Sequence, residues 1–486
     1  MMNHPVYYDN RPALGISKTG YEKGLPGGVC EYHDMEGSFL GRLFGTDGVR
    51  GAANTELTPE LAMELGRAGG TFLREHGRAG RPVLIGRDTR ISGPMLEAAM
   101  IAGLTSAGLH VIKLGIITTP GVAYLTRRLD GLGGIMISAS HNPAVDNGIK
   151  FFSAGGFKLT DTEEDSIEAI LKHKGNIKKP GGTEVGRVYE GEHFRRFYLD
   201  HLAQTINTPL KGLKIVVDCA NGAAATLAPE LYRSLGADVE AVFTETDGCR
   251  INVNCGSTCI GALQERVKHN GACLGIAHDG DADRVIAVDE YGRLVDGDHI
   301  MAVCGGYLLS RGRLPHKRIA VTVYSNLGLR DYFRSMGGDV QITDNGDRYV
   351  LECMQRMGLI LGGEQSGHII FLEHNTTGDG MVSALQLMQV MAETGLPLSS
   401  LADALVTYPQ VLKNIRVRRK DAWRENAAIA ESIKYAEGIM GERGRIFVRA
   451  SGTEPLIRVM AEGPEQRVLE EFVAQIASVI ESELNR

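Results

Sequence analysis

The sequence lacks several features that would each place it in a large class of proteins. Its 486 residues contain no apolar run of membrane-spanning length and no signal-peptide pattern at the start, so we expect a cytoplasmic protein without a membrane association. Eight cysteines form no C-x-x-C pair, as in a reduced compartment. With 52 basic against 59 acidic residues there is no basic excess, so nucleic acid is not an expected partner. The composition favours small-molecule chemistry.

A structural zinc site and a nucleotide site are also disfavoured. The densest cysteines have two histidines nearby, but they lack the tightly paired spacing of zinc knuckles, so reduced thiols are expected. No G-x-x-x-x-G-K-[ST] loop occurs, so ATP is not an obvious phosphoryl donor. The residues of the disfavoured zinc cluster are Cys249, Cys255, Cys259, Cys273, His269 and His278.

Alternating apolar runs divide most of the chain into repeated units. Residues 1–40 show no periodicity and predict an irregular extension. Strand-like and helix-like segments then alternate, restarting near Leu213 and Arg318, which predicts parallel, doubly wound sheets. Strands 411–417, 446–448 and 457–460, with helices near 421–435 and from 465, form a smaller last unit. The predicted fold class is α/β, with three consecutive doubly wound mixed α/β domains (41–195, 196–297, 298–408) and a C-terminal α+β domain (409–486).

A serine follows one apolar strand in an unusually polar turn. Ser140 comes directly after the strand around Ile135–Ile137, and His141, Asn142 and Lys150 provide donors and cations near it. A serine hydroxyl is a weak nucleophile until neighbours activate it, and these groups suit an anion attached to its oxygen. The pattern predicts phosphoryl transfer.

An acidic motif ends the corresponding strand of the second unit. Asp279, Asp281 and Asp283 stand at spacing i, i+2, i+4 and bring three hard oxygen ligands into one turn, which suits Mg²⁺. A calcium loop of the EF-hand type would need glycine at its sixth position, where Arg284 stands. A solvated acidic turn is the plainer alternative, and the spacing favours magnesium over it.

Three further motifs carry weaker signals. Glu364, Ser366 and His368 alternate with glycines after the strand near 359–361, and Arg50 lies in a glycine-rich turn; either motif could equally shape a turn. The 449–455 loop is rich in hydroxyls and backbone N–H groups and has guanidinium forks at Arg449 and Arg458, which fits a phosphate dianion. Ligands of open α/β sheets bind beyond the carboxyl ends of strands. The motifs around Ser140, Asp279 and Glu364, which end strands of the first three units, are therefore expected to face one cleft.

Taken together, and in this order, these motifs resemble the α-D-phosphohexomutase superfamily across residues 42–486. The runs 44–51, 346–350 and 375–380, with Gln365 in 363–368, look most like the bacterial phosphoglucosamine mutases; phosphomannomutase/phosphoglucomutase relatives more often carry methionine where Gln365 stands. Cys259 stands where relatives often have histidine. The resemblance implies a phosphoserine enzyme that interconverts glucosamine 6-phosphate and glucosamine 1-phosphate through a bisphosphate intermediate. A homodimer is a further expectation from it.

The resemblance also implies a role for each site residue. Ser140 would carry the phosphate and share one Mg²⁺ with Asp279, Asp281 and Asp283. Lys150, His141 and His368 are all candidates for the base that takes the hydroxyl proton, and our hypothesis is Lys150, with a pKa lowered by burial and nearby cations. The implied catalytic helpers are His141, Lys150, Arg284 and His368, and the implied substrate-binding residues are Arg50, Asn142, Glu364, Ser366, Arg449, Ser451, Gly452, Thr453 and Arg458.

Three other functions remain open from sequence. A phosphomannomutase or phosphoglucomutase would share the serine, the metal and the phosphate loop. A non-catalytic sugar-phosphate-binding protein would not need Ser140 or the aspartates. A phosphatase with an aspartate nucleophile would use Asp279 directly and form no phosphoserine.

Overall fold

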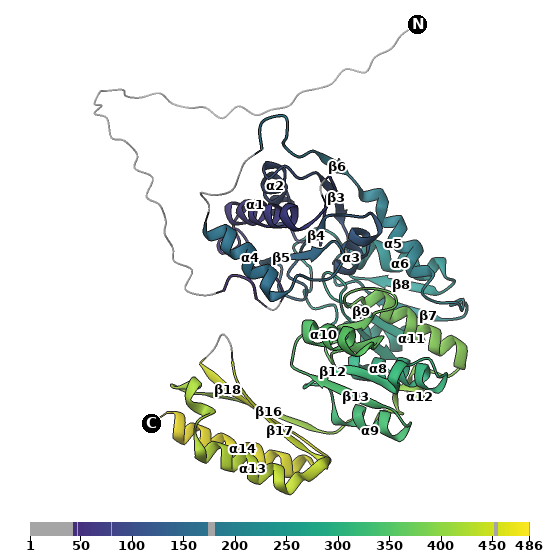
Figure 1. Ribbon diagram of the computed structural model, residues 1–486. Coiled ribbons are helices and arrows are strands. Elements are labelled where there is room, and N and C mark those ends of the chain that lie inside the picture. Colours follow the sequence, from purple (N-terminus) through teal and green to yellow (C-terminus); the bar gives the residue numbers. More distant parts are fainter. Residues whose placement is uncertain (1–41, 46, 79, 174–179, 452–454, 486) are drawn as a thin grey trace, which may run out of the picture. The chain divides into compact units, whose positions relative to one another are not determined.

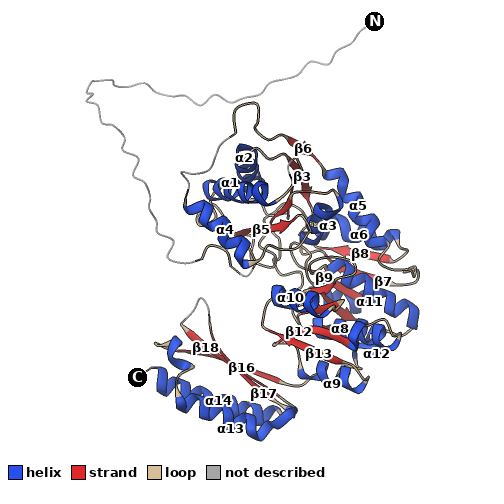
Figure 2. Cartoon of the chain, viewed as in Figure 1, coloured by secondary structure: helices blue, strands red, loops and turns tan. Residues whose placement is uncertain are grey.

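The computed structural model describes residues 42–45, 47–78, 80–173, 180–451 and 455–485, which form four sheets with their helices (Figures 1 and 2). The predicted extension 1–40 lies outside the described residues. The α/β class with mixed sheets and a last α+β unit is confirmed. In each of the first three sheets, antiparallel strands lie at one edge beside the parallel strands, as expected for mixed domains.

The first sheet has six strands in the order β1-β5-β4-β2-β3-β6. Its side chains alternate between two cores, since Val83 and Ile85 face the layer of α1, α2 and α4 while Leu84 faces that of α3 and α5. Figure 1 shows the two helix layers. The elements are β1 (Val49–Ala52), α1 (Pro59–His76), β2 (Val83–Arg87), α2 (Gly93–Ser106), β3 (Val111–Ile116), α3 (Thr119–Arg128), β4 (Gly133–Ile137), β5 (Asp146–Ser153), α4 (Asp161–Lys172), β6 (Val188–Glu190) and α5 (Arg195–Ala203).

The second sheet has the order β11-β10-β9-β7-β8. One face continues the core of the first sheet through Ile215 and Val217, and the other packs Val216 under α7. The elements are β7 (Lys214–Asp218), α6 (Ala224–Ser234), β8 (Asp238–Val242), α7 (Gly261–Asn270), β9 (Leu274–His278), β10 (Val285–Asp289) and β11 (Leu294–Val295).

The third sheet has the order β13-β12-β14-β15 and shares the same continuous core. Its strand β14 begins two residues later than the predicted 359–361 strand, because Leu359 packs with Val350 and Met354 of α10 before the strand starts. The elements are α8 (Gly297–Ser310), β12 (Arg318–Thr322), α9 (Leu327–Ser335), β13 (Asp339–Thr343), α10 (Asp347–Met357), β14 (Leu361–Gly363), β15 (Ile369–Phe371), α11 (Gly380–Thr394) and α12 (Leu398–Ala402).

The fourth sheet is antiparallel and has its own core around Ile457 and Phe472. The helix predicted over 421–435 begins later, because Asn426 caps it by accepting the Ile429 N–H at 3.1 Å. The elements are β16 (Gln410–Arg416), α13 (Ala427–Met440), β17 (Arg445–Ala450), β18 (Leu456–Glu462) and α14 (Gln466–Leu484).

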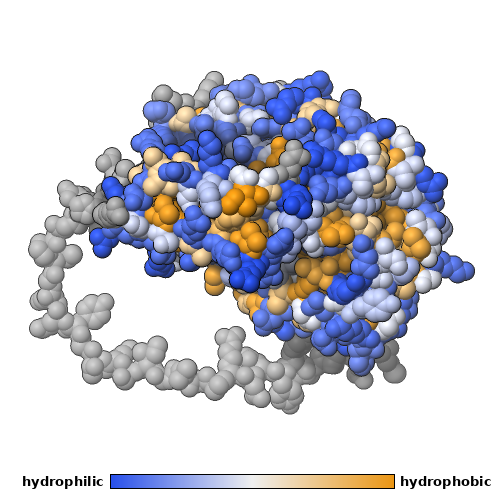
Figure 3. Space-filling model, turned by 90° about the horizontal axis from the view of Figure 1, so that it is seen from below, coloured by the Kyte–Doolittle hydropathy of each residue, from blue (hydrophilic) through white to orange (hydrophobic). Residues whose placement is uncertain are grey.

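The molecular surface drawn in Figure 3 mixes hydrophilic residues with several separate apolar areas. Exposed large hydrophobic residues such as Val406 and Leu412 contribute to the surface. No helix of the described ranges has the length and apolar character needed to cross a bilayer.

Candidate active site

Four of the five sequence motifs occupy equivalent places, because each lies at the connection between two antiparallel strands, whereas Arg50 of the fifth lies on β1. The serine loop (138–145) joins β4 to β5, and the aspartate loop (279–284) joins β9 to β10. The glutamate loop (364–368) joins β14 to β15, and the C-terminal loop (451–455) joins β17 to β18. In each case the antiparallel pairing of the two strands fixes where the motif loop begins and ends.

The serine and aspartate loops meet directly. Ser140 Oγ donates to Asp279 Oδ2 at 2.6 Å, and both residues are fully buried. Gly280 makes this approach possible, since a Cβ there would lie 2.6 Å from the Ser140 carbonyl oxygen. Ser140 itself has φ +53°, a left-handed conformation that is unusual for serine.

Asp279, Asp281 and Asp283 fit a divalent cation. One carboxylate oxygen of each lies within 4.8 Å of the others, and all three residues are buried. Burial raises the pKa of Asp279, and repulsion from Asp283 and Asp281 raises it further. Oδ1 of Asp281 and Oδ1 of Asp283 are buried without a hydrogen-bond partner among the described residues. A hard cation would satisfy these oxygens, and carboxylates are ligands that Mg²⁺ prefers.

Lys150 does not have the lowered pKa that we predicted for a base. Its Nζ lies 2.8 Å from Asp281 Oδ2, 3.0 Å from Asp47 Oδ2 and 3.5 Å from Asp283 Oδ2. Burial alone would lower the pKa of Lys150, but these three carboxylates outweigh it and raise the pKa above its ordinary value. The prediction failed because the carboxylates around Lys150 come from two other loops.

His141 and Arg284 line a cavity of about 810 Å³ beside the two loops. His141 Nδ1 lies 3.4 Å from Ser140 Oγ. Burial, with the cations Arg284 and Arg50, lowers the pKa of His141 to about 4, so its ring is neutral at pH 7. Burial opposes the charge of Arg284, but Asp283 and Asp279 raise its pKa.

The glutamate loop forms another part of the cavity wall. Glu364, Gln365 and Ser366 line the cavity, and Ser366 Oγ donates to Glu364 Oε2 at 3.1 Å. His368 points instead toward the aspartate loop, with Nδ1 3.7 Å from Asp283 Oδ2. The first three loops therefore surround one space, as their sequence positions predicted.

Arg50 and Asn142 pair with each other at the serine loop. Arg50 Nη1 donates to Asn142 Oδ1 at 3.2 Å, and Nη2 pairs with Asp47. Asn142 Nδ2 donates to Asp146 Oδ2 at 2.9 Å. Both predicted residues are therefore held beside Ser140.

Two of the predicted phosphate-binding residues, Arg449 and Arg458, lie on the fourth sheet. Arg449 and Arg458 are opposite each other in the β17–β18 pairing, and Ser451 O accepts from Lys420 Nζ at 3.1 Å. The Arg449 guanidinium lies 5.3 Å from the ring centre of Tyr324, which lines the cavity. Gly452 and Thr453, predicted to bind phosphate, lie outside the described residues.

Sequence reasoning missed several residues of the site. Thr119 Oγ1 donates to Asp281 Oδ2 at 2.6 Å, and Lys158 Nζ lies 2.6 Å from Asp47 Oδ1 and 2.5 Å from Asp347 Oδ2. Asp47 stood in the turn that we singled out for Arg50. Thr119 and Lys158 carried no motif signal.

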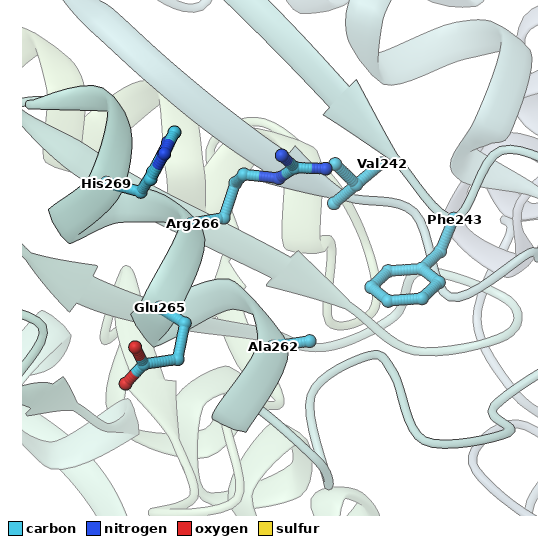
Figure 4. Close-up of a pocket in the computed structure, with 6 residues that line it drawn as sticks. All are labelled: Val242, Phe243, Ala262, Glu265, Arg266 and His269. Atoms are coloured by element: carbon cyan, nitrogen blue, oxygen red, sulfur yellow. The ribbon is translucent and has the colours of Figure 1, made fainter.

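A separate cavity of about 660 Å³ lies at the end of β8 and along α7 (Figure 4). None of its lining residues belongs to the four motif loops, and Arg266 there pairs with Glu240 at 3.2 Å. The first cavity is therefore the candidate active site. The residues that line the separate cavity are Val242, Phe243, Ala262, Glu265, Arg266 and His269.

Comparison with known proteins shows the family of the chain. The four domain profiles of phosphoglucomutase/phosphomannomutase match residues 41–178 (domain I), 196–292 (domain II), 296–408 (domain III) and 412–479 (the C-terminal domain). The chain belongs to this family. A phosphoglucosamine mutase of Carboxydothermus hydrogenoformans is 54% identical over 443 residues, covering 91% of this chain and 100% of that protein. The chain is therefore an isomerase of the phosphohexomutase type.

Solved structures share the fold at lower identity. A phosphoglucomutase/phosphomannomutase family protein from Burkholderia thailandensis has a TM-score of 0.78 at 23% identity, covering 90% of this chain and 97% of that one. The N-acetylphosphoglucosamine mutase of Aspergillus fumigatus, solved with GlcNAc-6P and magnesium, has a TM-score of 0.64 at 18% identity, covering 91% and 96%.

Proposed function

We propose that this phosphohexomutase interconverts glucosamine 6-phosphate and glucosamine 1-phosphate through a phosphoserine at Ser140. The observation that carries the proposal is the contact between Ser140 Oγ and Asp279 Oδ2, which sets a nucleophile against three buried carboxylates beside a cavity. Relatives more than 50% identical over most of the chain are phosphoglucosamine mutases, which supports the choice of sugar.

Asp279, Asp281 and Asp283, with the phosphate on Ser140, would hold one Mg²⁺. When bound, this cation neutralises negative charge on the transferring phosphoryl group. The protein's own contribution is to keep the three carboxylates together, which Lys150 and Thr119 support by their contacts with Asp281. Magnesium in the related Aspergillus fumigatus enzyme is consistent with this choice.

The reaction consists of two phosphoryl transfers. In the first, the bond between Ser140 Oγ and phosphorus breaks, the sugar O1 bonds to that phosphorus, and the hydroxyl proton of O1 ends on Ser140 Oγ. The product is glucosamine 1,6-bisphosphate, which also serves as activator for enzyme that has lost its phosphate. After this intermediate reorients, Ser140 Oγ bonds to the phosphorus of the 6-phosphate, the bond from that phosphorus to O6 breaks, and the proton of the Ser140 hydroxyl ends on O6. No phosphate is consumed in a complete cycle.

The cavity walls supply the binding groups. Glu364 and Ser366 face the cavity and would bind sugar hydroxyls. Arg50, Asn142 and His141 would contact the transferring phosphate, while Arg284, Lys150 and His368 would balance its charge. Positioning and charge balance are the main demands of phosphoryl transfer.

The distal phosphate would bind at the fourth sheet. Arg449 and Arg458 are a cross-strand pair of like charges, an arrangement that is unfavourable by itself and that a phosphate dianion would relieve. Ser451, Gly452 and Thr453 would complete this phosphate site.

We also propose the domain limits 41–195, 196–297, 298–408 and 409–486, a cytoplasmic location and a homodimeric assembly. Size-exclusion chromatography with light scattering tests the homodimer, since a monomer at micromolar concentration contradicts it.

The deciding experiment compares sugar phosphates in a coupled assay with Mg²⁺ and a trace of the matching bisphosphate. A kcat/KM that is highest for glucosamine 6-phosphate, against glucose 1-phosphate and mannose 1-phosphate, is the expected result. Preference for glucose or mannose phosphates would make the protein a phosphoglucomutase or phosphomannomutase. No turnover of any of them would leave the binding-protein function, and release of inorganic phosphate without a phosphoserine would favour the aspartate phosphatase.

A further inference from the structure

The conformation of Ser140 requires an explanation that the substrate site does not supply. Its φ of +53° is a left-handed conformation, which costs a non-glycine residue on the order of 1 kcal/mol or more. Such a conformation persists only where the surrounding contacts determine it. The groups that bind the backbone of Ser140 are therefore those that aim its hydroxyl at Asp279.

Arg90 is the main group that binds this backbone. Its side chain is fully buried, and Nη2 donates to the carbonyl oxygens of Ser140 and Asn142, each at 2.9 Å. Nη1 donates to Asp146 O at 2.9 Å and also to Pro143 O. One guanidinium therefore binds four carbonyl oxygens in and beside the serine loop. Because burying an unpaired cation is unfavourable, these carbonyls must converge on Arg90 to compensate its loss of water.

A second chain of hydrogen bonds reaches the other side of the Ser140 peptide. Arg90 Nε donates to Asp88 Oδ2 at 3.0 Å, and Ser138 Oγ donates to the same oxygen at 2.6 Å. Ser138 Oγ in turn accepts the Ser140 N–H at 2.9 Å. Both the N–H and the C=O of Ser140 are thus fixed by groups connected to one buried ion pair.

The second sheet contributes a matching donor. Asn252 Nδ2 donates to Ser140 O at 2.8 Å and to Asn142 O at 3.0 Å, the two carbonyls that Arg90 Nη2 also binds. The serine loop is therefore held between the first and second sheets. Arg90 itself is buried, and it is not among the residues that line the 810 Å³ cavity.

We propose that Arg90, with Asp88 and Ser138, is a positioning residue that holds Ser140 in the conformation from which it accepts and donates phosphate. This inference rests on the proposed function of Ser140. An arginine that only stabilised the fold would affect activity through the amount of folded enzyme. A positioning residue changes turnover per folded molecule, because small misplacements of reacting groups lower rates strongly.

The test uses the full-length protein with Arg90→Lys, whose compact ammonium cannot bind four carbonyls and Asp88 together. We expect kcat for glucosamine 6-phosphate to fall about 100-fold with KM within about threefold of wild type. Phosphorylation of the dephosphorylated enzyme by glucose 1,6-bisphosphate, followed by intact mass, should slow by a similar factor. Arg87→Lys is the matched control, because Arg87 is the last residue of β2, three positions before Arg90, and its guanidinium pairs with Glu97 at 3.5 Å. This variant should retain wild-type kinetics.

Ser138→Ala is the second variant and removes only the hydroxyl between Asp88 and Ser140 N–H. It should lower kcat about tenfold at unchanged KM, and it decides the matter if Arg90→Lys does not fold. Wild-type kcat and phosphorylation rate in either folded variant would overturn the proposal, as would a change confined to KM. Failure of the proposed function looks different, because the wild-type enzyme itself would then show either poor turnover of glucosamine 6-phosphate or no phosphorylation of Ser140.

Discussion

Ser140 and Asp279, which are 139 positions apart in the sequence, share a 2.6 Å hydrogen bond between Oγ and Oδ2. Each lies in a hairpin loop of a different sheet, and each is fully buried. The two loops can meet only while the first and second sheets keep their shared core. The nucleophile Ser140 and the three aspartates thus form a single site. Substitutions at the serine and at the aspartates test its two components separately.

Ser140→Ala should abolish turnover without unfolding the protein. The substitution removes the oxygen that carries the phosphate and leaves a side chain that the buried site can hold. We expect a loss of at least about 10³-fold in kcat, and no added phosphate in intact mass after treatment with glucose 1,6-bisphosphate. Ser153→Ala, on β5 where Ser153 Oγ contacts Phe157 O, is the control and should remain active. Mutase activity near the wild-type rate in Ser140→Ala would refute the mechanism.

Removing the metal should stop the reaction reversibly. Chelation with EDTA is expected to abolish turnover, and excess Mg²⁺ should restore it. Asp281→Asn should raise the Mg²⁺ concentration needed for half-maximal activity at least tenfold, because it removes one of three negative ligands. Asp331→Asn changes a carboxylate that accepts from the Tyr408 hydroxyl and pairs with Arg330, away from the aspartate loop, and should leave this requirement unchanged. Full activity in EDTA would contradict the magnesium site.

Much of this site could be predicted because it depends on local patterns. Polar residues directly after apolar strands pointed to Ser140, the aspartates and Glu364, and the carboxyl ends of neighbouring strands meet at one sheet edge. The helix predicted from 465 is found as α14 for the same reason, since apolar spacing is a local property of the sequence.

The remaining features depend on contacts between distant segments. The pKa of Lys150 is set by Asp281, Asp47 and Asp283, which come from two other loops, so reasoning from its neighbours in sequence gave the wrong direction. Lys158 shows no motif, and its contact with Asp347 joins positions 189 apart. Arg90 follows strand β2 in a polar turn like the other motifs, which is a signal that could have been used.

The stability of the protein should depend on pH through Asp298. Burial, and then the nearby Asp296, raises the pKa of Asp298 to about 7, whereas an unfolded aspartate titrates near 4. Between these values the folded state binds more protons than the unfolded state, so the unfolding free energy falls as pH rises from about 4 to 7, by up to about 4 kcal/mol. His299, 2.6 Å from Asp296, is the other titratable group there.

Asp298→Asn should remove this pH dependence, because an amide does not titrate and its oxygen can still accept the Asn326 N–H. In thermal melts from pH 4.5 to 8, we expect the melting temperature of the variant to rise relative to that of the wild type as the pH increases. Asp403→Asn, at an exposed carboxylate, is the control and should follow the wild-type curve. Parallel curves for wild type and Asp298→Asn would contradict the assignment.

Glu462 should stabilise the attachment of the fourth sheet. This fully buried carboxylate accepts the Leu327 N–H of α9 at 3.0 Å and pairs with Arg445 at 2.6 Å. Glu462→Gln leaves Arg445 without its counter-charge, so we expect a loss of about 3 kcal/mol and faster proteolysis near residue 409. KM should rise, since β16 and β18 supply Gln410 and Met460 to the cavity wall. Glu471→Gln, in an exposed pair with Arg467, should change none of these measurements.

Gln365 should contribute to the choice of sugar. It lines the cavity between Glu364 and Ser366, and its Nε2 donates to Asp296 Oδ2 at 3.2 Å. Gln365→Met removes this donor and places an apolar side chain in the wall, so the cavity loses polar contacts that an amino sugar can use. Because a site built to hydrogen-bond its ligand discriminates against analogues that cannot pair, we expect the ratio of kcat/KM for glucosamine 6-phosphate over glucose 1-phosphate to fall at least about tenfold. Gln355→Met, at an exposed position of α10, is the matched control. An unchanged ratio in a folded Gln365→Met enzyme would show that sugar choice lies elsewhere in the wall, and would direct attention to Asp296 itself.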